Sequence, residues 1–159
     1  MTTIVYRDGV MAADSRGYSG TSRPFGERCK VQRFADARLV GASSTEPGAA
    51  EAVIKWLAQG ADPEAKLPAK FTLLAVDRHG FAVLAVDSPY LSGPVDAPYF
   101  AIGSGDAYAL GAMAVGADAV RACEIAIGLD VWSSFPIYCV KHDERVVDII
   151  RDHSQEARP

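Results

Sequence analysis

The residue with the clearest chemical potential is Thr2, which directly follows Met1. A hydroxyl is a weak nucleophile at neutral pH unless a neighbouring base accepts its proton. Once Met1 is removed, the α-amine of Thr2 can act as that base, because an α-amine has an unperturbed pKa of about 7.7–8.0. A small second residue leaves room for a methionine aminopeptidase. Position 2 can therefore supply a nucleophile and its general base in one residue.

Metal chemistry has little support in the sequence. Three histidines fall in a predicted turn, at a predicted strand end and in the tail: His79, His142 and His153. No pair of them has the spacing of metal ligands, so we expect neither a metal nor another cofactor. The three cysteines are odd in number and widely spaced: Cys29, Cys123 and Cys139. This pattern favours reduced thiols over a disulfide framework or a zinc site.

The elements that must position Thr2 are predicted to be strands. Alternating apolar residues and turn signals predict strands at residues 2–7, 10–15, 29–34 and 38–43. Asp8-Gly9 predicts a tight hairpin between the first two strands, and residues 17–26 form a Gly/Ser/Pro-rich loop. The first quarter of the chain is thus an all-β meander.

Helices and further hairpins follow. Thr45 is predicted to cap a helix that has Glu46 and Pro47 in its first turn and ends at Gly60. Beyond the loop at residues 61–70, the expected elements are a hairpin (71–76 and 80–87), a looser stretch limited by two prolines (90–102), two helices (about 104–116 and 118–129) and a hairpin (136–141 and 145–150). We expect one domain over residues 1–159, with two sheets face to face, covered by helices, and a polar tail from about residue 151.

Several segments in the same order along the chain carry a resemblance to a known family. They are residues 2–5 (TTIV), 13–16 (ADSR), 30–31 (KV), 39–44 (LVGASS), 71–77 (FTLLAVD), 101–105 (AIGSG), 108–109 (YA) and 124–126 (EIA). Together they resemble the proteasome β-type family, most closely its HslV-like N-terminal-threonine peptidases. The resemblance implies an α+β fold, the four-layer αββα sandwich of the N-terminal-nucleophile (Ntn) hydrolases.

The resemblance also implies roles for four side chains. Thr2 would be the nucleophile, and Lys30 would lower the pKa of its hydroxyl and amine by placing a positive charge beside them. Asp14 would pair with Lys30 and orient it, and Ser104 would contact the amine and relay protons through a water. The oxyanion would be bound by a backbone N–H in the small-residue strand end. The candidates for this donor are Ala42, Ser43 and Ser44.

Each of these residues also has an ordinary structural interpretation. Asp14 could accept hydrogen bonds within a turn, and Lys30 could be a solvated residue on an edge strand. Ser104, between two glycines, could be a helix N-cap.

The chain departs from the family pattern at two places, one that concerns partners and one that concerns the site. HslV has a second long helix where this chain has the loop at residues 61–70, so the first helical layer is shortened. An ATPase unfoldase or other activator is a possible partner, but its docking face is reduced. In the turn after the last helix, proteasome β subunits carry an aspartate and a serine, and HslV builds a cation site from backbone carbonyls. Ser133 or Ser134 could support the site here; we assign them no role and no cation.

Composition excludes some other functions. The chain has a formal net charge of −4, and no run of basic residues predicts a nucleic-acid partner. We see no signal peptide, and no apolar run approaches the roughly 20 residues of a spanning helix, so a cytoplasmic protein without a membrane partner is expected.

The leading hypothesis is a threonine endopeptidase that self-associates into rings and cleaves polypeptides in the enclosed chamber. A small-amide amidohydrolase of the same fold and a catalytically silent structural ring are the alternatives.

Overall fold

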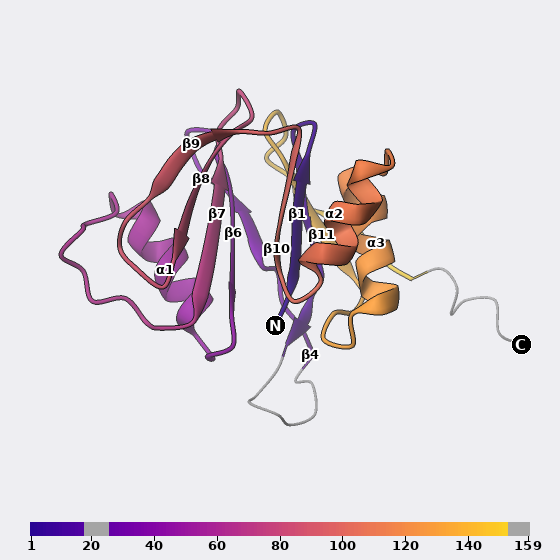
Figure 1. Ribbon diagram of the computed structural model, residues 1–159, viewed down its shortest axis with the longest axis horizontal. Helices are drawn as coiled ribbons and strands as arrows, with labels where there is room; N and C mark the ends of the chain where they lie inside the picture. Colours follow the sequence, from indigo (N-terminus) through magenta and orange to yellow (C-terminus); the bar gives the residue numbers. More distant parts are fainter. Residues whose placement is uncertain (18–25, 153–159) are drawn as a thin grey trace, which may run out of the picture.

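The strands form two five-stranded antiparallel sheets that lie face to face (Figure 1). The computed structural model describes residues 1–17 and 26–152. The β1 sheet has the order β10-β1-β2-β11-β12: Tyr99–Gly103, Thr3–Arg7, Val10–Ala13, Ile137–Lys141 and Asp148–Ile150. The β7 sheet has the order β5-β6-β7-β8-β9: Val31–Arg33, Leu39–Ser44, Phe71–Val76, Phe81–Val86 and Ser92–Asp96. A short ribbon pairs β3 (Arg16–Gly17) with β4 (Gly26–Glu27).

Helices cover the outer face of each sheet (Figure 1). Helix α1 (Ala49–Ala58) packs on β6 and β7, whereas α2 (Asp106–Ala114) and α3 (Ala119–Leu129) pack on the β1 sheet. The packing order is therefore α1, the β7 sheet, the β1 sheet, and the pair α2 and α3. Among the described helices, none is long and apolar enough to cross a membrane.

Strand β1 is covered on both faces, and its successive side chains alternate between these two faces. Ile4 and Tyr6 belong to the apolar cluster between the two sheets, and Val5 belongs to the cluster under α2 and α3. Because successive side chains of a strand point to opposite faces, a strand that is covered on both faces reads as a continuous apolar run. This run makes β1 a rigid, buried base for the residues that precede it.

Most predicted strands and helices are observed. Asp8 and Gly9 have φ values of 48° and 81°, the left-handed geometry of a tight hairpin turn. Most of the predicted loop at residues 17–26, together with His153 and most of the tail, lies outside the described residues.

The prediction that Thr45 caps the first helix is wrong. Helix α1 begins at Ala49, after Gly48, whose φ of 80° is left-handed and stops helical geometry from extending further back. The preceding residues form a turn in which Glu46 N donates to Ser44 Oγ over 2.9 Å.

The prediction of a looser stretch at residues 90–102 is also wrong, because β9 and β10 lie there. Pro94 is on β9, the outer strand of the β7 sheet, where the missing N–H faces no further strand of that sheet. Pro98 precedes β10, so it interrupts no pairing of that strand.

Candidate active site

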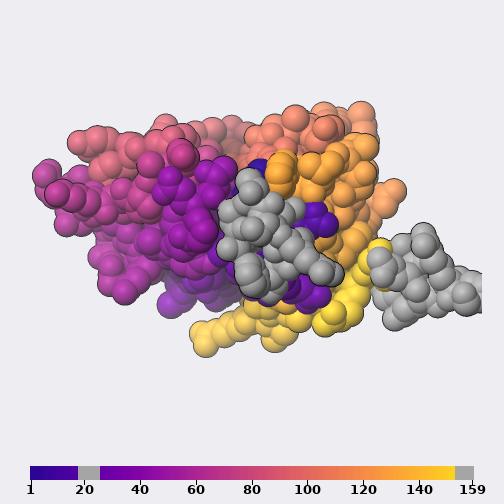
Figure 2. Space-filling model, turned by 90° about the horizontal axis from the view of Figure 1, so that it is seen from below, coloured from indigo at the N-terminus to yellow at the C-terminus, as the bar shows by residue number. Residues whose placement is uncertain are grey.

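Thr2 lies at the entrance to β1 and is held by the turn that follows β10. Its backbone N donates to Ser104 Oγ over 3.1 Å, and its carbonyl accepts from Ser104 N over 2.7 Å. Thr2 is only 2 % exposed. The Met1 amine donates to the Ser44 carbonyl at the end of β6, over 2.9 Å. The chain therefore begins between the two sheets, at the end of the molecule seen in Figure 2.

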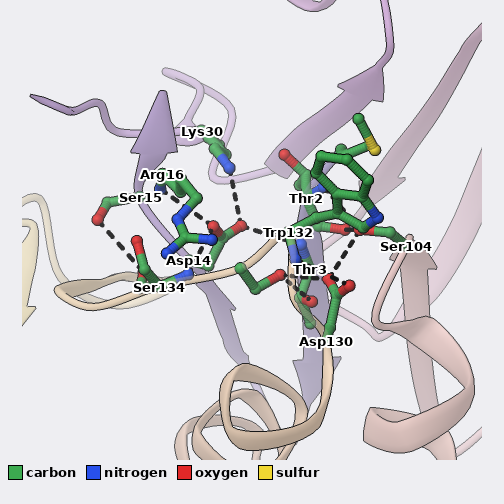
Figure 3. A network of polar contacts seen from close by, with 12 residues as sticks. Thr2, Thr3, Asp14, Ser15, Arg16, Lys30, Ser104, Asp130, Trp132 and Ser134 are labelled. Carbon is green, nitrogen blue, oxygen red and sulfur yellow. Dashed lines mark hydrogen bonds and ion pairs between the residues drawn. The ribbon is translucent and has the colours of Figure 1, made fainter. Parts of the chain in front are cut away.

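A buried ion pair lies beside this N-terminus. Lys30, just before β5, places Nζ 2.8 Å from Oδ1 of Asp14, which directly follows β2. The same Oδ1 accepts from Thr3 N over 2.9 Å, so one carboxylate oxygen joins the lysine to the residue next to Thr2 (Figure 3). The other oxygen, Oδ2, accepts from the backbone N of Arg16 and of Ser134. Four donors therefore compensate this buried carboxylate for its lost hydration.

The electrostatic environment links Lys30 to the N-terminus. Burial lowers the pKa of Lys30, and the Asp14 carboxylate opposes that shift. Burial also lowers the pKa of the Met1 amine, and the positive charge of Lys30 is the next largest cause. Because the Lys30 side chain is only 1 % exposed, its interpretation as a solvated edge residue is wrong. Asp14 does accept a hydrogen bond from the nearby Arg16 N, but its other oxygen also binds Lys30 Nζ.

Ser104 is supported from behind by a second buried carboxylate. Its Oγ donates to Asp130 Oδ2 over 2.8 Å, and Ser133 Oγ donates to the same oxygen over 2.7 Å. A hydroxyl has one proton, so a Ser104 that donates to Asp130 meets the N–H of Thr2 with a lone pair. Gly105, not Ser104, is the N-cap of α2, and no side chain caps that helix.

The glycines on either side of Ser104 allow its turn to lie close to Thr2 and Thr3. A Cβ on Gly103, whose φ is 103°, would lie 1.9 Å from the Thr2 carbonyl oxygen. A Cβ on Gly105 would lie 2.0 Å from Thr3 Oγ1. Both distances are far below contact, so any larger residue would displace the turn from Thr2.

Asp130 and Thr3 are the residues that sequence reasoning missed. Asp130 directly follows α3, and it is 6 % exposed although it is charged. The available signal was its spacing, because the chain reads Asp-x-x-Ser from Asp130 to Ser133, and the resembling family carries an aspartate and a serine in this turn. Ser134 contributes its backbone N to Asp14 and its carbonyl to Ser15 N.

The three candidate oxyanion donors lie at the end of β6. Strand β5 pairs with β6 only as far as Gly41, so residues 42–44 are paired with β7 alone. In an antiparallel ladder, the N–H and C=O of one residue point to the same edge. The Ser44 carbonyl accepts from Met1, so the Ser44 N–H is directed to the same edge as the N-terminus.

Two cavities flank Met1. One, of about 220 Å³, is lined by residues that include Met1, Arg16, Arg28 and Glu46. The other, of about 360 Å³, adjoins Met1, Phe71, Asp87 and Ser104. Met1 and Ser44 line both cavities, so both spaces adjoin the N-terminus. Within the part of the chain that the structure describes, no group of three or more His, Cys, Asp or Glu side chains is arranged to hold a metal ion.

No family model matches the chain, and no curated protein matches it in sequence. Solved structures do match. HslV from Trypanosoma brucei is 17% identical, with a TM-score of 0.62 over 89% of this chain and 99% of that one. Anbu (ancestral beta-subunit) from Yersinia bercovieri is 12% identical, with a TM-score of 0.64 over 96% and 88%.

A third solved structure, BPH from Thiobacillus denitrificans in complex with epoxomicin, is 18% identical, with a TM-score of 0.56 over 95% of this chain and 99% of that one. At identities this low, the structural similarity establishes the fold and leaves the activity open. The antiparallel sheets and helices match the fold of these structures, and the chain has the HslV and proteasome β-type fold.

Proposed function

We propose that this protein is an Ntn hydrolase, a threonine endopeptidase whose nucleophile is Thr2 after removal of Met1. We also propose that its single domain is the four-layer αββα sandwich with a first helical layer reduced to α1. The observation that carries the proposal is the Lys30–Asp14 ion pair, which shares Asp14 Oδ1 with the backbone N of Thr3. A buried ammonium group beside an N-terminal threonine has a chemical use, because its charge lowers the pKa of the attacking hydroxyl.

The reaction can be written with these groups alone. Thr2 Oγ attacks the carbonyl carbon of the scissile amide, and its proton passes to the Thr2 α-amine. The resulting ammonium group gives a proton to the leaving amine as the C–N bond breaks, which leaves an ester on Thr2 Oγ. Water then hydrolyses the ester, with the same amine as base. Ser104 accepts one N–H of the amine and so directs its lone pair, while Asp130 fixes Ser104.

The oxyanion of the tetrahedral intermediate needs a donor that does not belong to Thr2, because the Thr2 amine is the base. Among Ala42, Ser43 and Ser44, we assign this role to the N–H of Ser44. The contact that supports the assignment is the one between the Met1 amine and the Ser44 carbonyl, since it directs that edge of β6 toward the N-terminus.

We further propose that copies of the chain self-associate into a ring and enclose the site, with polypeptides as substrates. Helix α2 supports this proposal, because its exposed positions carry only small or apolar side chains after Asp106. Tyr108, Leu110 and Val115 are 44 %, 37 % and 88 % exposed. A helix that is apolar all round is usually buried. On the opposite side of the molecule, an ATPase or other activator would meet only α1 and the loop that follows it.

The enzyme and the catalytically silent alternative differ in the state of Met1, which can be measured. With Met1 attached, the Thr2 nitrogen is an amide without basicity, so catalysis requires its removal. Intact mass of the purified protein decides this step. A chain that lacks one methionine supports the enzyme, and a chain that keeps Met1 entirely supports a structural ring.

Covalent labelling tests the nucleophile directly. Epoxomicin, the compound in the BPH complex, is offered to the processed protein, and the modified residue is located by mass spectrometry. We expect one adduct on Thr2, and no adduct on Thr2→Ala. Hydrolysis of a peptide-amide reporter at equal rates by the wild type and Thr2→Ala would overturn the proposal. A small-amide hydrolase would instead act on short amides without a closed assembly.

A further inference from the structure

We propose that Thr3 is a positioning residue that couples the two halves of the site, the Lys30–Asp14 pair and the Ser104–Asp130 pair. The inference rests on the proposed function and adds a residue to it. Thr3 is fully buried, and each of its polar atoms outside the peptide carbonyl contacts a different half of the site (Figure 3).

The backbone of Thr3 belongs to the first half. Its N–H donates to Asp14 Oδ1 over 2.9 Å, and its carbonyl accepts from Asp14 N over 3.1 Å. Since the same Oδ1 receives Lys30 Nζ, the position of Thr3 sets where the ammonium lies relative to Thr2.

The side chain of Thr3 belongs to the second half. Its Oγ1 lies 2.8 Å from Ser133 Oγ, which in turn donates to Asp130 Oδ2. Because the single proton of Ser133 is directed to Asp130, the hydroxyl of Thr3 must be the donor in the contact with Ser133. The direction of every bond in this part of the network is therefore determined.

These bonds close a ring that begins and ends on adjacent residues. From the N of Thr2 it passes through Ser104, Asp130 and Ser133 to the hydroxyl of Thr3. A ring anchored at both ends on the adjacent residues Thr2 and Thr3 cannot shift as a unit along β1. Thr3 thus holds Asp130, which follows α3, in register with the nucleophile at the start of β1.

The surroundings of Thr3 fit closely around its hydroxyl. Thr3 pairs with Gly103 across the ladder of β1 and β10, and a Cβ on Gly105 would collide with Thr3 Oγ1 at 2.0 Å. Glycine at position 105 therefore makes room for this hydroxyl. An apolar residue of the same shape would fit the space and lose only the donor.

The test compares Thr3→Val, which keeps the shape and removes the donor, with Thr3→Ser, which keeps the hydroxyl. Each variant is processed, confirmed by intact mass to start at residue 2, and inactivated with epoxomicin. We expect Thr3→Val to lower the maximal inactivation rate about tenfold, the effect of one lost hydrogen bond, with an unchanged half-saturating concentration. Thr3→Ser should restore most of the rate. A structural role alone would lower stability and leave the rate of folded protein unchanged.

A double-mutant cycle isolates the contact. If the hydroxyl acts through Ser133, Thr3→Val should cost little further rate in a Ser133→Ala background. Wild-type rates in Thr3→Val, or equal losses in both backgrounds, would overturn the coupling while the proposed function stands. A wild type that does not react at all would instead overturn the proposed function. Should Thr3→Val fail to fold, Thr3→Ala against Thr3→Ser answers the same question.

Discussion

Lys30 Nζ lies 2.8 Å from Asp14 Oδ1, and neither side chain is more than 1 % exposed. The pair joins a residue that precedes β5 to one that follows β2, so it crosses from one sheet to the other. Its carboxylate also holds Thr3, the neighbour of the proposed nucleophile. A buried charge left without its partner is strongly unfavourable, which makes this contact sensitive to substitution.

Lys30→Met should therefore destabilise the protein as well as slow its reaction with epoxomicin. Removal of one partner of a buried ion pair typically costs about 3–5 kcal/mol of unfolding free energy. Denaturant unfolding at neutral pH measures this value, and Lys55→Met, at an exposed position of α1, is the matched control. A Lys30→Met protein as stable as the control and fully reactive toward epoxomicin would contradict the assignment.

Asp130→Asn should weaken the hold on Ser104 while the shape of the side chain is kept. Hydrogen bonds to a charged acceptor contribute about 1.5–3 kcal/mol, which corresponds to roughly 10- to 150-fold in rate. We expect a loss in this range in the maximal inactivation rate, compared with Asp143→Asn on the surface. An Asp130→Asn rate equal to that of the surface control would show that Ser104 needs no carboxylate.

Gly103→Ala should disrupt the site because its Cβ would overlap the Thr2 carbonyl oxygen. We expect loss of the Thr2 adduct and a lower midpoint of thermal unfolding. Gly128→Ala on α3 is the contrasting substitution, since a Cβ there meets no atom within 4 Å. It should raise stability by up to about 1 kcal/mol, the helix-propensity difference between the two residues. Calorimetry checks that Gly103→Ala lowers the thermal midpoint and that Gly128→Ala raises it.

The rate should fall as the pH is lowered, because the Thr2 amine must be neutral to accept the proton. Burial and the positive charge of Lys30 lower the pKa of the Met1 amine, and we expect the same direction for the amine of the adjacent Thr2 in the processed chain. The midpoint of the acid limb should thus lie below about 8, the value of an exposed α-amine. Lys30→Met removes a positive charge and should raise that midpoint. A midpoint that stays in place would argue against Lys30 as a neighbour of the base.

Val115→Lys should weaken self-association, because it places a charge on the apolar exposed face at the end of α2. Val146→Lys is the matched control, since Val146 is also highly exposed, at 68 %, but lies between β11 and β12. Sedimentation velocity measures the assembly of both variants. Equal assembly in the two variants would remove α2 from the interface.

The sequence by itself determined most of the local elements and pointed to the proposed nucleophile. Apolar residues and turn signals predicted most strands, because most strands of the two five-stranded sheets have buried residues on at least one face. The motifs around Thr2, Asp14, Lys30 and Ser104 were found from their order along the chain. Local pattern failed at Thr45, since the left-handed Gly48 outweighs a favourable capping residue, and at β9, where an edge strand tolerates a proline.

Only the tertiary structure decided which polar side chains meet. Asp130 is 26 residues from its partner Ser104, and Thr3 is 130 residues from Ser133. Such distances along the chain are closed by the packing of α3 on the β1 sheet, which depends on three-dimensional shape and not on periodicity. The packing of the two sheets against each other brings Lys30 and Asp14 together, and burial turns an ordinary lysine and aspartate into a charge pair next to the N-terminus.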